Sequence, residues 1–169
     1  MLKAIVPRMA RAAFLVNPST AKAVIRGAET AGRALGVPVT MLPARNANEL
    51  DQAFATLKKA PVQGLIVDLT LQDYWRQILD FALVNRLPTV SGPRAFTDAG
   101  GLVAYGPHFP DLYRRSAAYV VKIVKGARPA ELPVEEATRF ELALNLKTAK
   151  ALGLTIPQSL LVRADYAIQ

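Results

Sequence analysis

Residues 12–105 alternate short apolar runs with amphipathic segments, and this rhythm restricts the fold more than any other feature of the chain. The predicted strands fall at residues 12–16, 37–42, 64–67, 88–90 and 102–105, and the first of them is a continuous apolar run. Continuous apolar runs of this length are typical of parallel strands that are covered on both faces. Because right-handed crossovers place helices on both sides of such a sheet, the sequence predicts a five-stranded parallel sheet in flavodoxin-like order, the centre of a three-layer α/β/α fold.

Three of the intervening segments carry the signals of helix starts and of one buried side. The expected N-terminal caps are Ser19 or Thr20, then Asn46 in a capping box with Glu49, then Thr70 with Asp73. The expected buried stripes are Val24, Ala28, Ala31 and Leu35 in the first helix, Leu50, Phe54 and Leu57 in the second, and Trp75, Ile78, Leu79 and Ala82 in the third.

The rhythm changes after Tyr105. Residues 110–125 form one long amphipathic pattern that ends at Gly126, and a proline-bearing connection leads to an expected strand at Phe140. That strand passes directly into a helical turn, which Gly153 and then Pro157 end. The C-terminal part therefore adds one long helix, one strand and a short helical turn to the α/β unit.

Three segments of this half of the chain together resemble a known family: GGLVAYGP at residues 100–107, PDLYRRSAAYVVKIVKGARP at 110–129 and FELALNLKTAKALGLTIP at 140–157. They are similar to the end of an ABC transporter substrate-binding protein, a periplasmic binding protein of the type I fold related to tryptophan- and tyrosine-binding lipoproteins. The resemblance extends back to about Ala12. In that family a whole first lobe precedes this material, so the resemblance implies a C-terminal lobe without its first lobe.

The resemblance also implies how the chain is divided. Residues 12–105 correspond to the α/β lobe, and residues 106–138 to a helix that crosses the hinge, with the connection that follows it. Residues 139–169 correspond to a returning strand and a helical turn that complete the lobe. The expected fold is therefore a periplasmic-binding-protein type I lobe with a crossover helix and strand at its C-terminal end.

Open α/β sheets bind ligands at the carboxyl ends of their strands, and polar residues follow several of the predicted strands there. The candidate ligand-binding residues are Asn17, Ser19, Thr20, Asp68, Thr70, Ser91 and Tyr105. Ser19 and Thr20 would offer hydroxyls and backbone N–H groups to a carboxylate at a helix start. Asp68 would receive a ligand ammonium or cap the next helix, and Tyr105 would stack on a ligand or line the hinge.

The function that the resemblance implies is solute binding for an ABC importer. The ligand would be a small molecule such as an aromatic or branched amino acid, the partner an ABC permease, and no bond chemistry would take place. The sequence is consistent with a non-catalytic role, because the chain has no cysteine, a single histidine at His108, and no P-loop, GxGxxG or nucleophile elbow. We therefore expect no catalytic residue, no metal and no cofactor.

Two alternatives stay open. One is an oligomeric sensory or interaction domain with the same fold. The other is a receiver-like domain that accepts a phosphoryl group on Asp68. The receiver chemistry needs an acidic pair after the first strand to hold Mg²⁺, where this chain has Asn17, and a lysine after the fifth strand, where it has Tyr105 and Gly106.

The formal net charge of +8 raises the question of an anionic partner. Much of the excess comes early in the chain, from Lys3, Arg8, Arg11, Lys22, Arg26, Arg33 and Arg45. We expect these side chains on the solvent sides of helices, and no aromatic residues alternate with them to stack on bases. The pattern favours a solvated surface, and no nucleic-acid partner is expected.

Location and assembly follow from hydrophobic patterns. No apolar run approaches the ~18 residues that span a bilayer, and Pro7 and Arg8 interrupt the start too early for a signal peptide. A periplasmic or membrane-anchored extracytoplasmic location is expected if the chain is part of a longer parent.

The 110–125 helix carries Leu112, Val120, Ile123 and Val124 on a side that one lobe does not cover, which predicts a homodimer through this helix.

Overall fold

The computed structural model describes all residues 1–169 and contains one mostly parallel, seven-stranded sheet. The strands are β1 (Ala12–Val16), β2 (Val39–Pro43), β3 (Leu65–Val67), β4 (Thr89–Ser91), β5 (Val103–Pro107), β6 (Phe140–Asn145) and β7 (Tyr166–Ile168). Their order is β2-β1-β3-β4-β5-β6-β7. The first five pair in parallel, which confirms the flavodoxin-like prediction, whereas β6 runs antiparallel to β5 and β7 parallel to β6.

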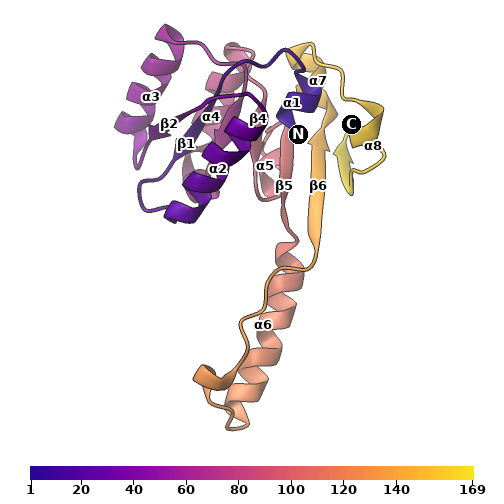
Figure 1. The fold of residues 1–169 in the computed structure, drawn as a ribbon. Coiled ribbons are helices and arrows are strands. Elements are labelled where there is room, and N and C mark those ends of the chain that lie inside the picture. The colour runs from indigo at the N-terminus through magenta and orange to yellow at the C-terminus, as the bar shows by residue number, and fades with distance from the viewer.

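Helices cover both faces of this sheet (Figure 1). They are α1 (Leu2–Ile5), α2 (Lys22–Ala34), α3 (Ala47–Lys59), α4 (Trp75–Val84), α5 (Ala95–Asp98), α6 (Phe109–Val124), α7 (Leu146–Leu152) and α8 (Gln158–Leu161). Two 3-10 helices, η1 (Leu69–Tyr74) and η2 (Pro129–Glu131), complete the list. None of these helices has the length and apolar character needed to cross a membrane.

One buried cluster joins the sheet to α3, η1, α4 and α5. The predicted stripes of α3 and α4 are buried, and all their residues except Ala82 belong to this cluster, so these two expectations are confirmed. The predicted capping box is present as well, because the Asn46 side chain accepts the Glu49 N–H at 3.0 Å. Within this cluster, Trp75 of α4 packs edge-on against Phe96 of α5, with ring centroids 5.3 Å apart.

A second buried cluster joins the N-terminal segment to the C-terminal end of the chain. Leu2 and Ile5 of α1 and Met9 belong to the same cluster as Leu152 of α7 and Leu160 of α8. The lobe is predicted to begin at about Ala12, but the preceding residues also belong to its core. Both ends of the chain therefore lie near each other on this unit (Figure 1).

The predictions for α2 are wrong in two respects. The helix begins at Lys22, after Ala21, and neither Ser19 nor Thr20 caps it. The Asn17 side chain accepts the N–H and the hydroxyl of Ser19, at 3.0 and 2.8 Å, and the Thr20 hydroxyl donates to Asp68. These bonds hold the two residues in a turn ahead of the helix, so their side chains are not free to cap it.

The predicted stripe of α2 is not buried either. Val24, Ala31 and Leu35 are exposed, and Gly32 is the buried residue of the helix. A Cβ atom at Gly32 would lie 2.7 Å from the Val37 carbonyl oxygen, so the helix approaches the sheet through its smallest residue. The stripe still faces the sheet, because Ala31 and Leu35 line an open apolar groove together with the strand residues Val39 and Val90, and it is exposed because nothing fills that groove.

The predicted caps Thr70 and Asp73 are also wrong. Asp68 caps η1 instead, because its carboxylate accepts the Thr70 N–H at 3.0 Å, and α4 begins only at Trp75. Because Asp68 directly follows a strand, its carboxylate reaches the first free backbone N–H of the next turn. The helical segment therefore begins at Asp68, ahead of Thr70 and Asp73.

Residues 108–139, here called the arm, project from the carboxyl end of β5 away from the rest of the molecule (Figure 1). The arm consists of α6 and a return segment, residues 125–139, that runs back to β6. The His108 N–H donates to the Arg139 carbonyl at 3.0 Å and closes the base. Along the arm, Arg115 bonds to Glu135, and the Tyr119 hydroxyl donates to the Pro133 carbonyl at 2.8 Å. No residue of α6 is buried.

Candidate ligand-binding edge of the sheet

Asp68 is the most unusual polar residue at the carboxyl edge. It directly follows β3, its N–H continues the ladder to the Leu15 carbonyl at 2.9 Å, and the residue is only 6% exposed. Its carboxylate accepts the Thr20 hydroxyl and the Thr70 N–H, and it takes part in no salt bridge. The neighbouring positions of β1 and β3 in the sheet bring Thr20 and Asp68 together.

This arrangement can receive a cation. Both bonds to the Asp68 carboxylate come from neutral groups, and an ionised carboxylate has about four lone-pair sites. A buried charge without a counter-charge is unfavourable, and a charge-assisted hydrogen bond from an ammonium group would relieve this cost. Thr20 and Thr70 hold the carboxylate in place, as a binding site requires.

The remaining predicted residues differ in whether their polar groups are free to bind a ligand. Asn17 and Ser19 bond to each other in an exposed turn, and the Thr70 side chain is exposed next to Asp68. The Ser91 hydroxyl is buried and donates to the Val67 carbonyl at 2.8 Å, so its proton is engaged within the sheet. Ser91 therefore links β4 to β3, and its hydroxyl proton is not free to donate to a ligand.

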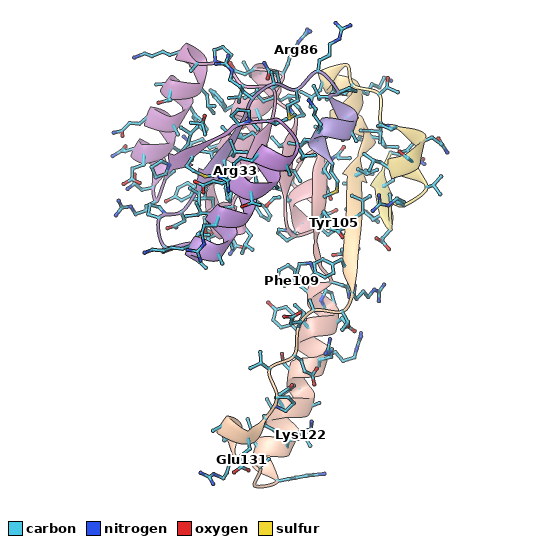
Figure 2. The ribbon with its side chains drawn as sticks, viewed as in Figure 1. Arg33, Arg86, Tyr105, Phe109, Lys122 and Glu131 are labelled. Atoms are coloured by element: carbon cyan, nitrogen blue, oxygen red, sulfur yellow. The ribbon has the colours of Figure 1, made fainter.

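Tyr105 lies on β5 just before the arm and is 43% exposed. Figure 2 shows Tyr105 just above the root of the arm. Its ring stacks on Phe140 of β6, with centroids 5.8 Å apart. Phe140 is not among the predicted partners of Tyr105, although it opens the predicted returning strand. The antiparallel register, in which Pro107 pairs with Phe140, is what brings the two rings together. The pair forms an aromatic surface at the root of the arm.

A cavity of about 650 Å³ opens at the root of the arm, between η1, the β4–α5 connection, α6 and β6. Its polar lining includes Arg94, Asp98, His108 and Glu141. Because Glu141 pairs with Gly106 and Leu142 with Tyr105, Glu141 and Tyr105 lie on opposite faces of the β5–β6 ribbon. This root cavity is thus on the other side of the ribbon from the exposed tyrosine, and the sequence analysis did not identify Glu141.

The single histidine lies in this lining. His108 occupies the N-cap position of α6, but its side chain accepts no capping hydrogen bond, so a capping role for the side chain is not found. Its Nδ1 atom is buried and has no partner. The neighbouring Arg94 guanidinium lies 4.1 Å from the centroid of the Tyr166 ring and 3.8 Å from Asp98. No group of three or more potential metal-ligating side chains is present in the molecule.

A family model described as "ABC transporter substrate binding protein" matches residues 1–168. A search of curated proteins finds no match. Among solved structures, a conserved domain protein from Vibrio cholerae aligns with a TM-score of 0.90 at 21% identity, over 98% of this chain and 57% of its own. An ABC domain from Streptococcus pneumoniae, solved in complex with L-Trp, aligns with a TM-score of 0.89 at 24% identity, over 99% of this chain and 59% of its own.

A third structure is the ligand-free, open form of a substrate-binding protein with adhesive properties from Clostridium difficile. It aligns with a TM-score of 0.71 at 19% identity, over 99% of this chain and 57% of its own. These structures share the fold. This chain spans less than three fifths of the length of each of them.

Proposed function

The chain belongs to the ABC transporter substrate-binding protein family, and from this premise we propose that it binds a small molecule at the carboxyl edge of its sheet, without catalysis, for delivery to an ABC permease. The proposed location is extracytoplasmic. Residues 12–105 and 139–169 would act as one lobe of a type I clamp, and residues 106–138 as the element that crosses its hinge. The fold and the family support this assignment, and no nucleic-acid partner is proposed.

The observation that carries the proposal is the buried carboxylate of Asp68, which has neutral donors and no counter-charge. An α-amino acid supplies the missing cation as its ammonium group. Its carboxylate would lie near Asn17, Ser19 and the amino end of α2, and an aromatic or branched side chain would contact Tyr105. The S. pneumoniae neighbour, whose complex contains L-Trp, supports an amino acid as the class of ligand.

Calorimetric titration tests the ligand class. We expect L-tryptophan or L-leucine to bind with a dissociation constant weaker than micromolar, because clamp affinity depends on burying the ligand between two surfaces. Indole-3-propionate, which lacks the ammonium group, should bind less well than tryptophan. Sub-micromolar binding to the monomeric chain would contradict the single-lobe interpretation.

Substitution tests the role of Asp68. Asp68→Asn keeps the size and an acceptor oxygen but removes the charge, and a lost charge-assisted hydrogen bond corresponds to roughly a 10- to 100-fold weaker affinity. Asp73→Asn is the matched control, since Asp73 is an exposed carboxylate five residues further along the chain. Equal affinities of the two variants for tryptophan would exclude Asp68 as the ammonium site.

A second candidate function is an oligomeric sensory or interaction domain. The arm is the observation that favours it, because α6 exposes large apolar side chains and buries none. This candidate predicts self-association that does not depend on any amino acid.

The receiver-like alternative has a direct test: acetyl phosphate with Mg²⁺ should leave Asp68 unmodified in a mass spectrum.

A further inference from the structure

The edge of the sheet at which the parallel strands begin carries a group of cations, and we call this surface the basic edge. It lies opposite the arm: Figure 2 shows Arg86 at one end of the molecule and Lys122 near the other. The connections that enter β1, β3 and β4 pass through it, and α7 begins there because β6 is antiparallel to β5. Its cations are all exposed, and none takes part in a salt bridge: Arg11, Lys58, Lys59, Arg86, Lys147 and Lys150.

Contacts between the elements hold these cations on one surface. The Arg11 N–H donates to the side chain of Gln63, in the connection that follows α3, at 2.9 Å. At the end of α3, the Lys58 ammonium lies 5.9 Å from the centroid of the Phe81 ring of α4. Lys147 lines a cavity of about 290 Å³ between α7 and the last turn of α4. The basic edge therefore extends without a break from β1 across α3 and α4 to α7.

Apolar side chains lie among the cations. Leu83 is 47% exposed and Val84 83% exposed, at the end of α4 just before Arg86. The cavity beside them has a mostly apolar lining, in which Asp80 is the one acidic residue. Exposed apolar side chains surrounded by Lys and Arg are typical of surfaces that lie on an anionic membrane, where the cations meet lipid phosphates and the apolar groups reach the acyl boundary.

Arg86 occupies a position whose backbone favours glycine, because its φ is +52°. The ends of α2, α4, α6 and α7 share one hydrogen bond, from the N–H of the residue after this position to the carbonyl five residues earlier. In the other three helices the position with positive φ is a glycine: Gly36, Gly126 and Gly153. The end of α4 thus keeps a cation where glycine would be less strained, and retained strain of this kind is found at functional positions.

We propose that the basic edge binds the surface of a membrane that contains anionic phospholipids. Its lysines and arginines contact lipid phosphates, and Leu83 and Val84 reach the boundary of the acyl chains. The apolar side chains favour a lipid surface over a nucleic acid or free phosphate, which offers nothing to cover them. This interaction goes beyond solute binding and does not depend on it. The arm, through which a two-lobed clamp would continue, leaves from the other end of the molecule.

Co-sedimentation of the full chain with lipid vesicles is the first test. We expect binding to vesicles of phosphatidylglycerol and phosphatidylcholine in equal parts, none to pure phosphatidylcholine, and a decrease with added salt. Lys150→Gln should weaken the binding about fivefold, the contribution of one cation near an anionic surface. Lys125→Gln is the matched control, because Lys125 is an exposed lysine without a salt bridge at the end of α6, and it should bind like the parent. No binding to the anionic vesicles, or equal loss in both variants, would overturn the proposal.

Two further substitutions separate the lipid contact from folding and from charge alone. Arg86→Gly should raise the midpoint of thermal unfolding by about 2–4 °C, because glycine adopts this φ without strain, and should weaken vesicle binding about fivefold. Val84→Ser should weaken vesicle binding several-fold, whereas Val24→Ser, at an exposed valine of α2, should not. Vesicle binding that is unchanged in Arg86→Gly or in Val84→Ser, or that duplex DNA displaces as well as anionic lipid does, would contradict the proposal.

Discussion

At the residue scale, the two glycines that join α5 to β5 have different reasons to be glycine. Gly100 has a φ of +109°, a backbone conformation that residues with a side chain rarely adopt. Gly101 is required by space instead, because a Cβ atom there would lie 2.2 Å from the Phe96 ring and 2.8 Å from its carbonyl oxygen. The sequence shows the pair of glycines but not the close approach that makes the second one necessary.

Gly101→Ala should therefore destabilise the protein. Phe96 is fully buried against Trp75, so it has little room to move, and overpacking of this kind typically costs about 1–3 kcal/mol. Gly27→Ala is the control in the middle of α2, where nothing lies within 4 Å of the added Cβ, and it should stabilise by about 0.5–1 kcal/mol. Urea unfolding measures both changes, and shifts of the same sign would contradict the packing seen around Phe96.

The candidate site shows what residue patterns predict and what they miss. That Thr20 and Asp68 lie close together follows from the predicted strand order, because β1 and β3 are neighbours in a flavodoxin-like sheet. The direction in which each side chain bonds does not follow from it. Ser91 turns its hydroxyl to the Val67 carbonyl, and Glu141 becomes part of a cavity only through the antiparallel register of β6.

At the element scale, the predicted apolar stripe of a helix is buried only where the helix packs closely against the sheet. The stripes of α3 and α4 meet the sheet and are buried. In α2, Gly32 approaches β2 closely, but Ala31 and Leu35 face an open groove over the sheet and stay exposed. Hydrophobic periodicity does not predict how tightly a helix closes on its sheet. The bounds of α6 are within one residue of those predicted. Of its predicted stripe, Leu112 lies beside the return segment, whereas Val120, Ile123 and Val124 stay exposed.

The arm also contains a clasp that should respond to pH. The hydrogen bond from Arg115 holds the pKa of Glu135 below its ordinary value of 4.5, and the Tyr119 hydroxyl near the same carboxylate lowers this pKa further. A carboxylate with a lowered folded pKa contributes stability above its unfolded pKa and loses it as the pH falls through the folded value. The clasp should thus stay closed from neutral pH down to about 4.5, weaken below that, and open as the pH falls through the lower pKa of the folded state.

The proton resonances of the Tyr119 ring measure this opening, because the Tyr119 hydroxyl donates to the Pro133 carbonyl of the return segment at 2.8 Å. They should move toward the values of a free tyrosine as the pH falls below 4.5 in the parent chain, and Glu135→Gln should show this change already at neutral pH. Glu136→Gln serves as the control, because the side chain of Glu136 makes no hydrogen bond and only its carbonyl accepts from Arg115. Tyr119 resonances that do not change with pH in the parent would show that the Arg115–Glu135 pair does not hold the segment.

At the scale of the whole molecule, the arm and the rest of the chain are energetically separate. Neither buried cluster contains a residue of the arm, and the arm joins the sheet only through β5 and β6. The pairing of those two strands continues to their ends, where the His108 N–H bonds to the Arg139 carbonyl. The geometry at that point is that of an antiparallel ribbon that a short turn could close.

Removal of the arm should therefore leave a folded protein. Replacing residues 109–138 with Asn-Gly would close β5 and β6 as a hairpin, since this dipeptide favours the tight turn whose twist matches the strands. We expect a midpoint of thermal unfolding within a few degrees of the parent, because no buried apolar contact is lost. The same variant should be monomeric by light scattering and should retain the weak ligand affinity that depends on Asp68. A molten or aggregated product would show that the arm contributes to folding, and a persistent dimer would place the dimer interface elsewhere on the molecule.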